Sequence, residues 1–521
     1  MNDVPRAQDA GTGDGNLAAD SKPKRQALAA VDLGAESCRV SLLRWVEGQP
    51  EIRLVHRFAN SATNKGTGLH WDLSNICNGV EEGLRACAQL APEGIAAIGV
   101  DGWAVDYVRL GPDGAPIGNP FCYRDERTVA TQKQVHSRIS PERLYELTGV
   151  QILGLNTLYQ LEADRDTEQG LPWINVPEFV MHWLGARRVS EYTNATHTQL
   201  LFVHNPDWCP EIFAAASLEL GAAPPLVKPG TDLGRVQGTL ASLPAFRETK
   251  LIAPACHDTA SAIAGIPAQG EDWGFISSGT WSLVGCVLDS PCVSADARNE
   301  NFSNQGGVGG GIYFLKNVNG MWLLRQCIEH WRLQGQVWTV EQLIAACADF
   351  AAPDYLFDVD QPDLLLPGDM PARINAQLKR VGQTPIPEGL GMAAAQMANL
   401  IFHSLADRYA EVLQNAARIT GKVLQRLYVV GGGSRNTLLN RLTERATGLE
   451  VLTGSTESTT VGNFSVQLAA LDGNYADGTG VSAIAVAKWA DVLAAQPIGL
   501  GNSIRAQKAD GIQPETGEAL A

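Results

Sequence analysis

The chain has 521 residues, of which 45% are hydrophobic and 18% are charged, so it contains enough apolar material for more than one buried core. Its formal net charge of −16 argues against a surface that neutralises nucleic-acid phosphates or anionic lipid, because such surfaces concentrate Lys and Arg. No stretch approaches the roughly 18 consecutive apolar residues of a membrane-spanning helix. We therefore expect a soluble globular protein, monomeric or homodimeric, that binds neither nucleic acid nor membrane.

Both ends of the chain differ in composition from its centre. Residues 1–26 contain almost no large apolar side chain and lack the apolar middle region of a secretory signal, so they are predicted to form a disordered extension. The polar residues 504–521 are predicted to form a flexible tail. The ten cysteines include no CxxC pair and no cluster with His at metal-ligand spacing, which favours reduced, buried thiols and a cytoplasmic location.

Strands and a helix alternate in the first half of the chain. An apolar run at 27–31 is followed by a polar turn and a second strand-like run at 39–45. Residues 74–90 carry apolar side chains at helical spacing, with Ser74 as the expected N-cap. The pattern of strand, turn and strand returns at 95–110. This alternation is typical of an α/β domain.

The second half repeats the alternation. A strand-like run at 251–255 opens it, and residues 275–281 give another strand, polar turn and strand. A long amphipathic helix is predicted from 392 to 417. The strand at 427–430 then runs into three glycines and a helix that Ser434 or Asn436 can cap.

The two alternating segments predict an α/β protein of two similar domains that flank a central cleft. We expect the first domain at 27–250 and the second at 251–503.

Three polar turns have the composition of a phosphate-binding site. Asp32 ends a strand and precedes a turn whose backbone amides can face a phosphate, with Arg39 nearby to balance negative charge. The turn at 277–280 offers small hydroxyl side chains, and the glycines at 431–433 let a ligand lie against bare backbone near a helix start. An ordinary hairpin or structural turn remains the alternative for each.

A carboxylate is the candidate general base. Asp258 directly follows a strand, where it can face the cleft and accept the proton of an alcohol; a simple helix cap is the alternative. Asp101, Trp103 and Asp106 alternate along one hairpin, where an aromatic ring beside carboxylates suits a sugar. A packed Trp between two solvated acids is the other interpretation. Together with the three turns, these residues favour an ATP-dependent transferase, although there is no GxxxxGK[ST] run and no protein-kinase motif set.

At these positions the sequence resembles the FGGY carbohydrate kinases, members of the actin-like, ribonuclease-H-like ATPase superfamily. The resemblance runs from about residue 29 to 486, and its DLG and GGG motifs are shared across the superfamily. The following segments carry it: AVDLGAESCRV (30–40), GVDGWAVDYV (99–108), YRDERT (123–128), NTLYQL (156–161), EYTNATHTQL (191–200), HDTASA (257–262), SSGTWSLVG (277–285), LKN (315–317) and VVGGGSRNTLLN (429–440).

The resemblance implies two ribonuclease-H-like domains, the first for sugar and the second for nucleotide. Because EYTNAT, HDTASA and SSGTWSL are specific to one branch of the family, it further implies transfer of a phosphoryl group from ATP to L-rhamnulose, giving L-rhamnulose 1-phosphate in L-rhamnose catabolism. Asp258 would be the base for the 1-hydroxyl, and Asp32 would help to hold Mg²⁺. Sugar contacts would come from Trp103, Ala104, His257, Asp258, Thr259 and Asn317. Nucleotide contacts would come from Ala35, Glu36, Ser37, Cys38, Arg39, Thr280, Arg325 and Gly432.

Several positions depart from the family pattern. Cys38 and Ala104 occupy positions where the family usually has Gly, and Arg325 occupies that of a nucleotide-contacting Gln. Thr443 and Thr447 replace a cysteine pair found in some relatives, so no disulfide is expected there. The added methyl group of Ala104 leaves open a kinase for another deoxyketose, such as L-fuculose. A non-catalytic nucleotide switch or sugar-sensing regulator is the alternative from another functional class.

Overall fold

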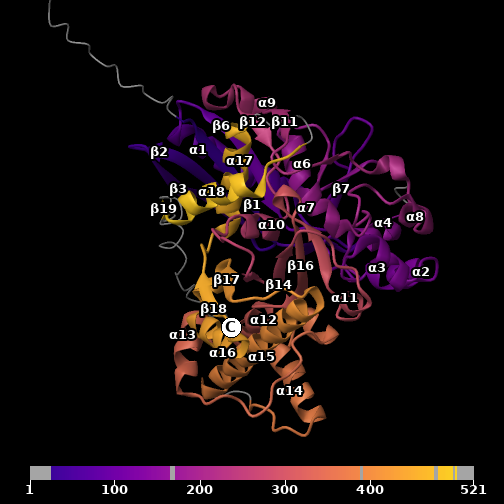
Figure 1. The fold of residues 1–521 in the computed structure, drawn as a ribbon, viewed down its shortest axis with the longest axis vertical. Helices are drawn as coiled ribbons and strands as arrows, with labels where there is room; N and C mark the ends of the chain where they lie inside the picture. The colour runs from indigo at the N-terminus through magenta and orange to yellow at the C-terminus, as the bar shows by residue number, and fades with distance from the viewer. Residues whose placement is uncertain (1–24, 165–169, 388–390, 474–478, 497–498, 501–521) are drawn as a thin grey trace, which may run out of the picture.

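Two mixed β-sheets that share the order of five strands form the framework of the protein (Figure 1). The structure is a computed structural model that describes residues 25–164, 170–387, 391–473, 479–496 and 499–500. The predicted extension at 1–26 lies outside the described residues except for Arg25 and Gln26, and the predicted tail at 504–521 lies wholly outside them.

The first sheet has seven strands in the order β11-β12-β6-β1-β2-β3-β19. Its centre is an antiparallel meander of β1, β2 and β3, and β6 then pairs parallel to β1, with β12 parallel to β6. The bounds are β1 Ala27–Leu33, β2 Ser37–Val46, β3 Gln49–Ala59, β6 Ile95–Gly102, β11 Asp232–Arg235, β12 Lys250–Ile252 and β19 Gly499–Leu500.

The second sheet has six strands in the order β15-β16-β14-β13-β17-β18. Again a meander of three antiparallel strands, β13, β14 and β16, is followed by two parallel ones, β17 and β18. The repeated order confirms the predicted pair of ribonuclease-H-like domains. The bounds are β13 Trp273–Ser278, β14 Trp281–Leu288, β15 Ser303–Gly306, β16 Ile312–Asn319, β17 Arg426–Val430 and β18 Glu450–Thr453.

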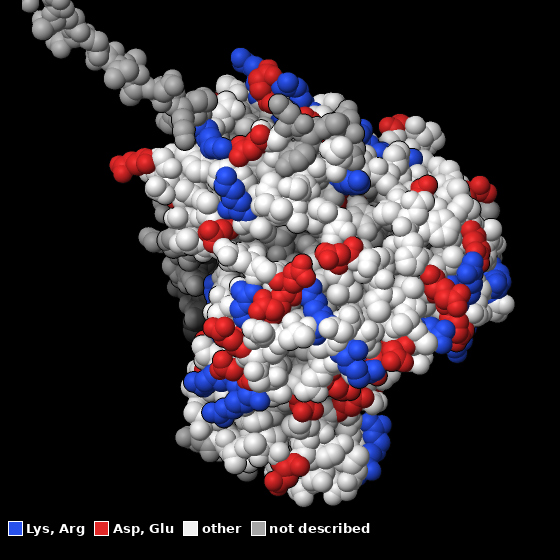
Figure 2. Space-filling model, viewed as in Figure 1, with Lys and Arg blue, Asp and Glu red and all other residues white. Residues whose placement is uncertain are grey.

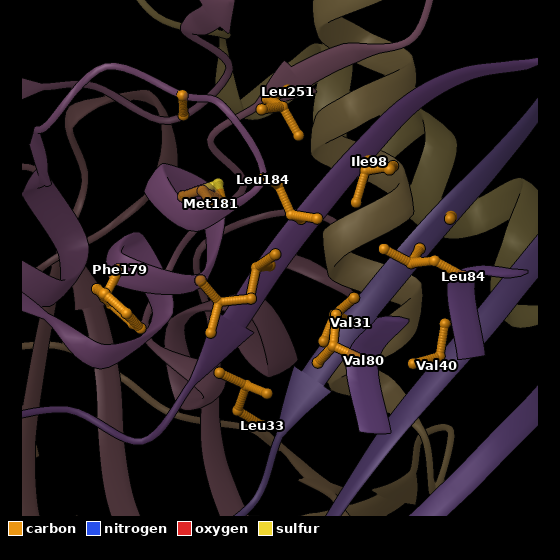
Figure 3. Packing of buried hydrophobic residues seen from close by; sticks show 14 of the residues in the cluster. Val31, Leu33, Val40, Val80, Leu84, Ile98, Phe179, Met181, Leu184 and Leu251 are labelled. Carbon is orange, nitrogen blue, oxygen red and sulfur yellow. The ribbon is translucent and has the colours of Figure 1, made fainter. Parts of the chain in front are cut away.

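Alternating side chains of β1 build two separate cores, one on each face of the first sheet. Ala29 and Val31 face α1 (Leu73–Leu90) and α6 (Val176–Trp183), with Val80, Leu84 and Phe179 packed around them (Figure 3). Leu28 and Ala30 face the opposite side, where they meet Val461, Phe464 and Leu468. Both faces are therefore covered, which explains why the whole of β1 is buried.

Two helices lie between the sheets and join the halves of the molecule (Figure 1). They are α10 (Asp258–Ala264) and α17 (Ser458–Asp472), and α17 packs on β1 and β6 although it comes from the C-terminal half. Their backbones approach closely, because a Cβ added at Gly462 would lie 1.8 Å from the Ser261 carbonyl oxygen. The base candidate and the C-terminal half thus share one tightly packed helix pair.

The remaining helices extend each domain. A segment between β6 and β11 forms its own apolar cluster, which surrounds Tyr159 and Trp173. It contains β7 Tyr107–Arg109, α2 Thr128–His136, α3 Pro141–Thr148, α4 Thr157–Ala163, β8 Trp173–Asn175, β9 Ser190–Glu191, α7 Tyr192–Ala195, α8 Pro210–Ala215 and β10 Leu226–Val227. Further helices and strands are β4 Thr63–Asn64, β5 Leu69–His70, α9 Gly238–Ala241, α11 Ala295–Asn299, α12 Trp322–Leu333, α13 Val340–Ala346, α14 Met370–Arg380, α15 Gly391–Thr420, α16 Thr437–Thr447 and α18 Ala483–Ala494.

The predicted elements are found with two differences. The strand at 251–255, expected to open the second half, pairs with β6 of the first sheet as β12. The N-cap of helix α1 lies two residues earlier than predicted, because Asp72 and not Ser74 accepts the hydrogen bond from the Asn75 backbone N–H. Asn436 caps α16, as one of the two predicted choices.

The surface and the helices add two observations. On the face drawn in Figure 2, acidic and basic side chains are interspersed, and Lys and Arg do not gather into one patch. Among the described residues, no helix has both the length and the apolar character needed to cross a membrane.

Candidate functional site

Three aspartates meet at the carboxyl ends of three parallel strands. Asp32 near the end of β1 is paired with Asp101 of β6, and a bridge joins Gly102 to His257, the residue before Asp258. Ligands of open α/β sheets bind at this edge, because the strands end there and the loops diverge. The fold therefore gathers carboxylates that are far apart in the sequence at one site.

Asp258 is the most accessible of the three. It is the first residue of α10, and 34% of its side chain is exposed. Burial of the remainder raises its pKa to about 7, and the negative charge of Asp32 acts in the same direction. Its carboxyl accepts a hydrogen bond from the Thr259 backbone N–H, so its orientation is defined. A carboxylate with these properties can accept a proton near neutral pH.

Asp101 is fully buried between the two halves. Asn463 of α17 donates to its Oδ2 at 2.5 Å, whereas its Oδ1 has no hydrogen-bond partner among the described residues. Burial raises its pKa well above the usual value, and the charges of Asp32 and Asp258 add to this effect. Neither this acid nor Asp106 is solvated, in contrast to the alternative considered for the hairpin.

The turn after β1 is held by Asn60. The Asn60 backbone N–H donates to the Glu36 carbonyl oxygen, and its side-chain amide donates to that of Gly34, each at 3.0 Å. Beside the turn, Arg39 Nη1 donates to Asp32 Oδ2 at 3.0 Å, and Arg39 Nε lies 3.4 Å from Glu457. Ala35 and Ser37 are half-buried, and Glu36 is exposed. The turn is thus held in place, and the Arg39 guanidinium borders it.

The Cys38 side chain lies on the buried side of this turn, where its thiol donates to the Gly34 carbonyl oxygen at 3.8 Å. Its sulfur is fully buried in the core that contains Val40 and Val80, and burial raises the pKa of the thiol to about 12. Replacement of the usual Gly by Cys therefore adds volume to the core and leaves the face of the turn unobstructed.

Predicted nucleotide residues from the two halves meet at Glu36. Its carboxylate forms an ion pair with Arg325 of α12 and accepts a hydrogen bond from Thr280 Oγ1 at 3.3 Å. Thr280 lies in the turn that joins β13 to β14, opposite the turn that joins β1 to β2. The two hairpin turns therefore face each other across the halves of the molecule.

The glycine turn after β17 presents one open position. A Cβ at Gly433 would lie 2.0 Å from Ser278 Oγ, and one at Gly431 would lie 2.8 Å from the Ser278 carbonyl oxygen. Gly431 also has a φ of 81°, which favours glycine. Gly432 is exposed and has nothing within 4 Å of an added Cβ. Packing explains the outer two glycines, and only Gly432 offers free space.

Two buried histidines lie beside Asp258. His257 Nε2 lies 3.3 Å from Asp258 Oδ1, and the ring of His197 lies 3.9 Å from that of His257. Burial lowers the pKa of His197 to about 3 and that of His257 well below its ordinary value, so both rings are neutral. Sequence reasoning missed His197, although it lies within EYTNATHTQL. That motif is the only feature of the sequence that could have pointed to His197 as a site residue.

The hairpin after β6 is more buried than its alternation suggests. Trp103 Nε1 and Trp71 Nε1 both donate to Asp106 Oδ2, at 3.0 and 2.6 Å, and the two indole rings lie 4.5 Å apart. Trp103 is 6% exposed and Ala104 is 8% exposed. Val105 has a φ of 70°, and its carbonyl oxygen accepts a hydrogen bond from Thr157 Oγ1 at 2.7 Å. The hairpin is therefore held rigidly by buried bonds.

Asn317 links the second sheet to the first domain. It lies on β16 opposite Leu283 and is half-buried. Its backbone N–H and its side-chain amide both donate to Gln151 Oε1, at 3.0 and 2.8 Å. Thr259 is buried next to Asp258. Asp258, His257 and Thr259 form one group, while Asn317 approaches from the other half.

A cleft of about 610 Å³ opens between the halves beside Glu457. Its lining includes Leu54 of β3, Tyr428 of β17, Arg435 and the loop at 453–457. None of the predicted nucleotide or sugar residues lines this cleft. Glu457, which does line it, forms an ion pair with Arg39.

Comparison with solved structures defines the class of protein. The gluconate kinase from Lactobacillus acidophilus superposes with a TM-score of 0.70 at 16% identity, covering 93% of this chain and 95% of that one. The glycerol kinase from Plasmodium falciparum, solved with ADP, gives a TM-score of 0.68 at 13% identity, covering 93% and 96%. The fold is that of the two-domain carbohydrate kinases.

Sequence comparison narrows the class to a family. Residues 27–265 match the N-terminal domain, and residues 274–471 the C-terminal domain, of the FGGY family of carbohydrate kinases. The rhamnulokinase of Bacteroides thetaiotaomicron is 36% identical over 450 residues, 85% of this chain and 90% of that protein. That of Enterococcus faecalis is 35% identical over 454 residues, 86% and 90%. The chain belongs to the FGGY family of carbohydrate kinases, enzymes whose substrates are ATP and a sugar.

Proposed function

We propose that this kinase transfers the γ-phosphoryl group of ATP to the 1-hydroxyl group of L-rhamnulose, giving ADP and L-rhamnulose 1-phosphate in the breakdown of L-rhamnose. The observation that carries the proposal is the match of two rhamnulokinases over about 85% of the chain, which includes the Asp258 segment. The half-exposed Asp258 at the carboxyl edge of the first sheet supports it.

Asp258 is the general base in this proposal. Its carboxylate accepts the proton of the 1-hydroxyl as the sugar oxygen bonds to the γ-phosphorus and the bond from that phosphorus to ADP breaks. The proton then passes to solvent. His257, being neutral, contacts the sugar as a hydrogen-bonding group without adding charge beside the base.

The remaining sugar contacts come from both halves. Thr259 lies beside the base, and Asn317 reaches in from β16. Trp103 and Ala104 border the sugar with the rigid hairpin; because the Trp103 N–H is already bonded to Asp106, that residue contributes ring surface only. The 27–250 segment is thus proposed as the sugar domain and 251–503 as the nucleotide domain.

The nucleotide lies across the facing hairpin turns in this proposal. The backbone of Ala35, Glu36, Ser37 and Cys38 faces the phosphates, and Arg39 and Arg325 balance their charge. Thr280 adds a hydroxyl donor, and Gly432 provides open backbone for the nucleoside.

Mg²⁺ is proposed as the metal, held by Asp32. In the described residues, no group of three or more His, Cys, Asp or Glu side chains is arranged to hold a metal. Kinase Mg²⁺ sites use one or two carboxylates together with phosphates and water, and the carboxylates of Asp32 and the partnerless Asp101 Oδ1 at the same sheet edge fit that pattern. When bound, the ion neutralises charge on the transferred phosphoryl group.

We also place the enzyme in the cytoplasm as a monomer or a homodimer. All ten cysteines are free, and each is buried or half-buried, which supports a reducing compartment.

The test is ADP release by the purified protein with Mg-ATP and a panel of L-rhamnulose, L-fuculose and xylulose, with the product identified. We expect selective turnover of L-rhamnulose, reduced about 100- to 10,000-fold in Asp258→Asn with nucleotide binding retained. Better turnover of L-fuculose would make that ketose, and not L-rhamnulose, the preferred substrate. Near-normal activity of Asp258→Asn would overturn the assignment of Asp258 as the base. Folded protein that binds ATP without sugar-dependent ADP release would favour a regulator.

A further inference from the structure

A buried glutamate holds the backbone that leads to Asp258. Glu191 ends β9 and caps α7, and it is fully buried. Its Oε2 accepts a hydrogen bond of 2.8 Å from the Cys256 backbone N–H and one of 2.5 Å from Thr193 Oγ1. Its Oε1 accepts one of 2.9 Å from the Thr193 backbone N–H. One carboxyl group thus ties two distant segments together.

Thr193 extends this connection to the next residue. The His257 backbone N–H donates to Thr193 Oγ1 at 3.3 Å, while that hydroxyl donates to Glu191. On the other side, the Cys256 carbonyl oxygen accepts a hydrogen bond of 2.9 Å from the Gly102 backbone N–H. The two peptide N–H groups that precede Asp258 are therefore fixed by Glu191 and Thr193, and the intervening carbonyl is fixed by β6.

Burying an acid at position 191 costs folding free energy. Among the described residues, no Lys, Arg or His forms an ion pair with Glu191, and the second buried acid, Glu178, lies against it. Burial raises the pKa of Glu191 to about 8 although three donors oppose the shift. A well-packed apolar residue would avoid this desolvation cost, so a buried acid at this position needs another reason.

We propose that Glu191 is a positioning residue which, acting with Thr193, fixes the backbone at 256–257 so that the Asp258 carboxylate faces the acceptor hydroxyl. The consequence for catalysis rests on the proposed role of Asp258 as the base. The ordering of the backbone does not depend on it.

Isosteric variants test the proposal. Glu191→Gln places an N–H₂ group against an N–H donor, and Thr193→Val removes the hydroxyl that binds the His257 N–H. Thr193→Ser keeps that hydroxyl and is the conservative rescue. Glu178→Gln is the matched control, because Glu178 is equally buried and accepts hydrogen bonds from the Glu191 N–H and from Asn194, at 3.0 and 2.8 Å, but among the described residues from neither Cys256 nor Thr193.

Steady-state kinetics give the first measurement. We expect kcat to fall about 10- to 100-fold in Glu191→Gln and Thr193→Val, as for other residues that orient a catalytic group, with the KM for ATP unchanged. Thr193→Ser and Glu178→Gln should retain kcat within about threefold. Equal losses in all four variants would mean a purely structural role and would overturn the proposal.

The second measurement is hydrogen exchange of the peptide that covers residues 256 and 257. Exchange of its amides should be at least tenfold faster in Glu191→Gln and Thr193→Val than in the wild type or Glu178→Gln. Hydrogen exchange distinguishes failure of the positioning role from failure of the proposed function. Unchanged exchange would refute the positioning role, whereas faster exchange with no activity of the wild type on any ketose would refute the proposed function alone.

Discussion

Asp32 Oδ2 accepts a hydrogen bond of 3.0 Å from Arg39 Nη1, so the acid near the carboxyl end of β1 is paired with a guanidinium of the neighbouring strand β2. This pair controls the charge around Asp258. Burial raises the pKa of Asp258 most, the Asp32 carboxylate raises it further, and Arg39 lowers it, with a result of about 7.

The first prediction concerns the pH dependence of catalysis. A base must be ionised in the free enzyme, and Asp258 with a pKa of about 7 is ionised only above that pH. We expect kcat/KM for the sugar to be level above pH 7.5 and to fall about tenfold per pH unit well below pH 7. The measurement is a pH profile of initial rates, with circular dichroism at each pH as the control for folding. A profile that stays level down to pH 5 would contradict the assignment.

Two neighbouring glycines provide a matched pair. Gly433→Ala should destabilise the protein by about 1–3 kcal/mol, because its Cβ would lie 2.0 Å from Ser278 Oγ in a packed region. Gly432→Ala meets no atom within 4 Å and should leave the thermal midpoint unchanged, while weakening ADP binding about tenfold if the nucleotide lies against that backbone. Thermal denaturation and calorimetric ADP titration separate the effects. Normal ADP affinity in Gly432→Ala would remove that residue from the proposed site.

The Glu36–Arg325 pair predicts effects of opposite sign on nucleotide affinity. Both side chains are almost half exposed, at 44% and 46%, so breaking the pair should change stability by less than about 1 kcal/mol. Arg325→Gln removes positive charge near the phosphates and should weaken ATP binding several-fold. Glu36→Gln frees Arg325 and should tighten it. Both shifts should shrink in 0.5 M salt, and identical affinities at low salt would place the pair away from the phosphates.

Buried acids predict how stability changes with pH. Burial raises the pKa of Glu178 from 4.5 to about 7, so between these values the folded protein holds a proton that the unfolded chain has released. This contribution is complete below pH 4.5 and is lost as pH rises through 7. Glu191, with a pKa of about 8, has the same sign.

We therefore expect the urea midpoint to fall between pH 6.5 and 8.5. It should fall less in Glu178→Gln, which has no proton to lose. The lowered pKa values of His197 and His257 act in the opposite direction, but only as the pH falls through 6.5, so these histidines do not contribute above that pH. A midpoint that rises over this range would refute the prediction.

Local patterns in the sequence predicted the parts of the fold that depend on neighbours in the chain. The hairpin of β1 and β2, the helix α1 and the glycine turn follow from alternation, helical spacing and turn residues. The sheet to which β12 belongs depends on pairing with β6, more than 140 residues earlier in the chain, and no local signal specifies it. Likewise α17 is buried on nearly all sides, so it has no polar face to mark it as a helix between two sheets.

The site shows the same division. Asp258 and Asp32 were accessible to prediction because each follows an apolar strand, and the family motifs supplied their roles. The contact of Glu191 with the Cys256 N–H and the contact between the rings of His197 and His257 join segments about 60 residues apart. Such contacts depend on tertiary packing, which composition and spacing do not contain.

The position of α17 between the sheets has a consequence for synthesis on the ribosome. Phe464 and Leu468 complete the core on one face of β1, a strand that is synthesised more than 400 residues before them. That face of the first domain stays open until α17 has been made, and a fragment that ends near residue 265 would expose it to solvent and to other chains. Residues of the C-terminal half therefore complete the core of the N-terminal domain, and the two halves reach their native state together.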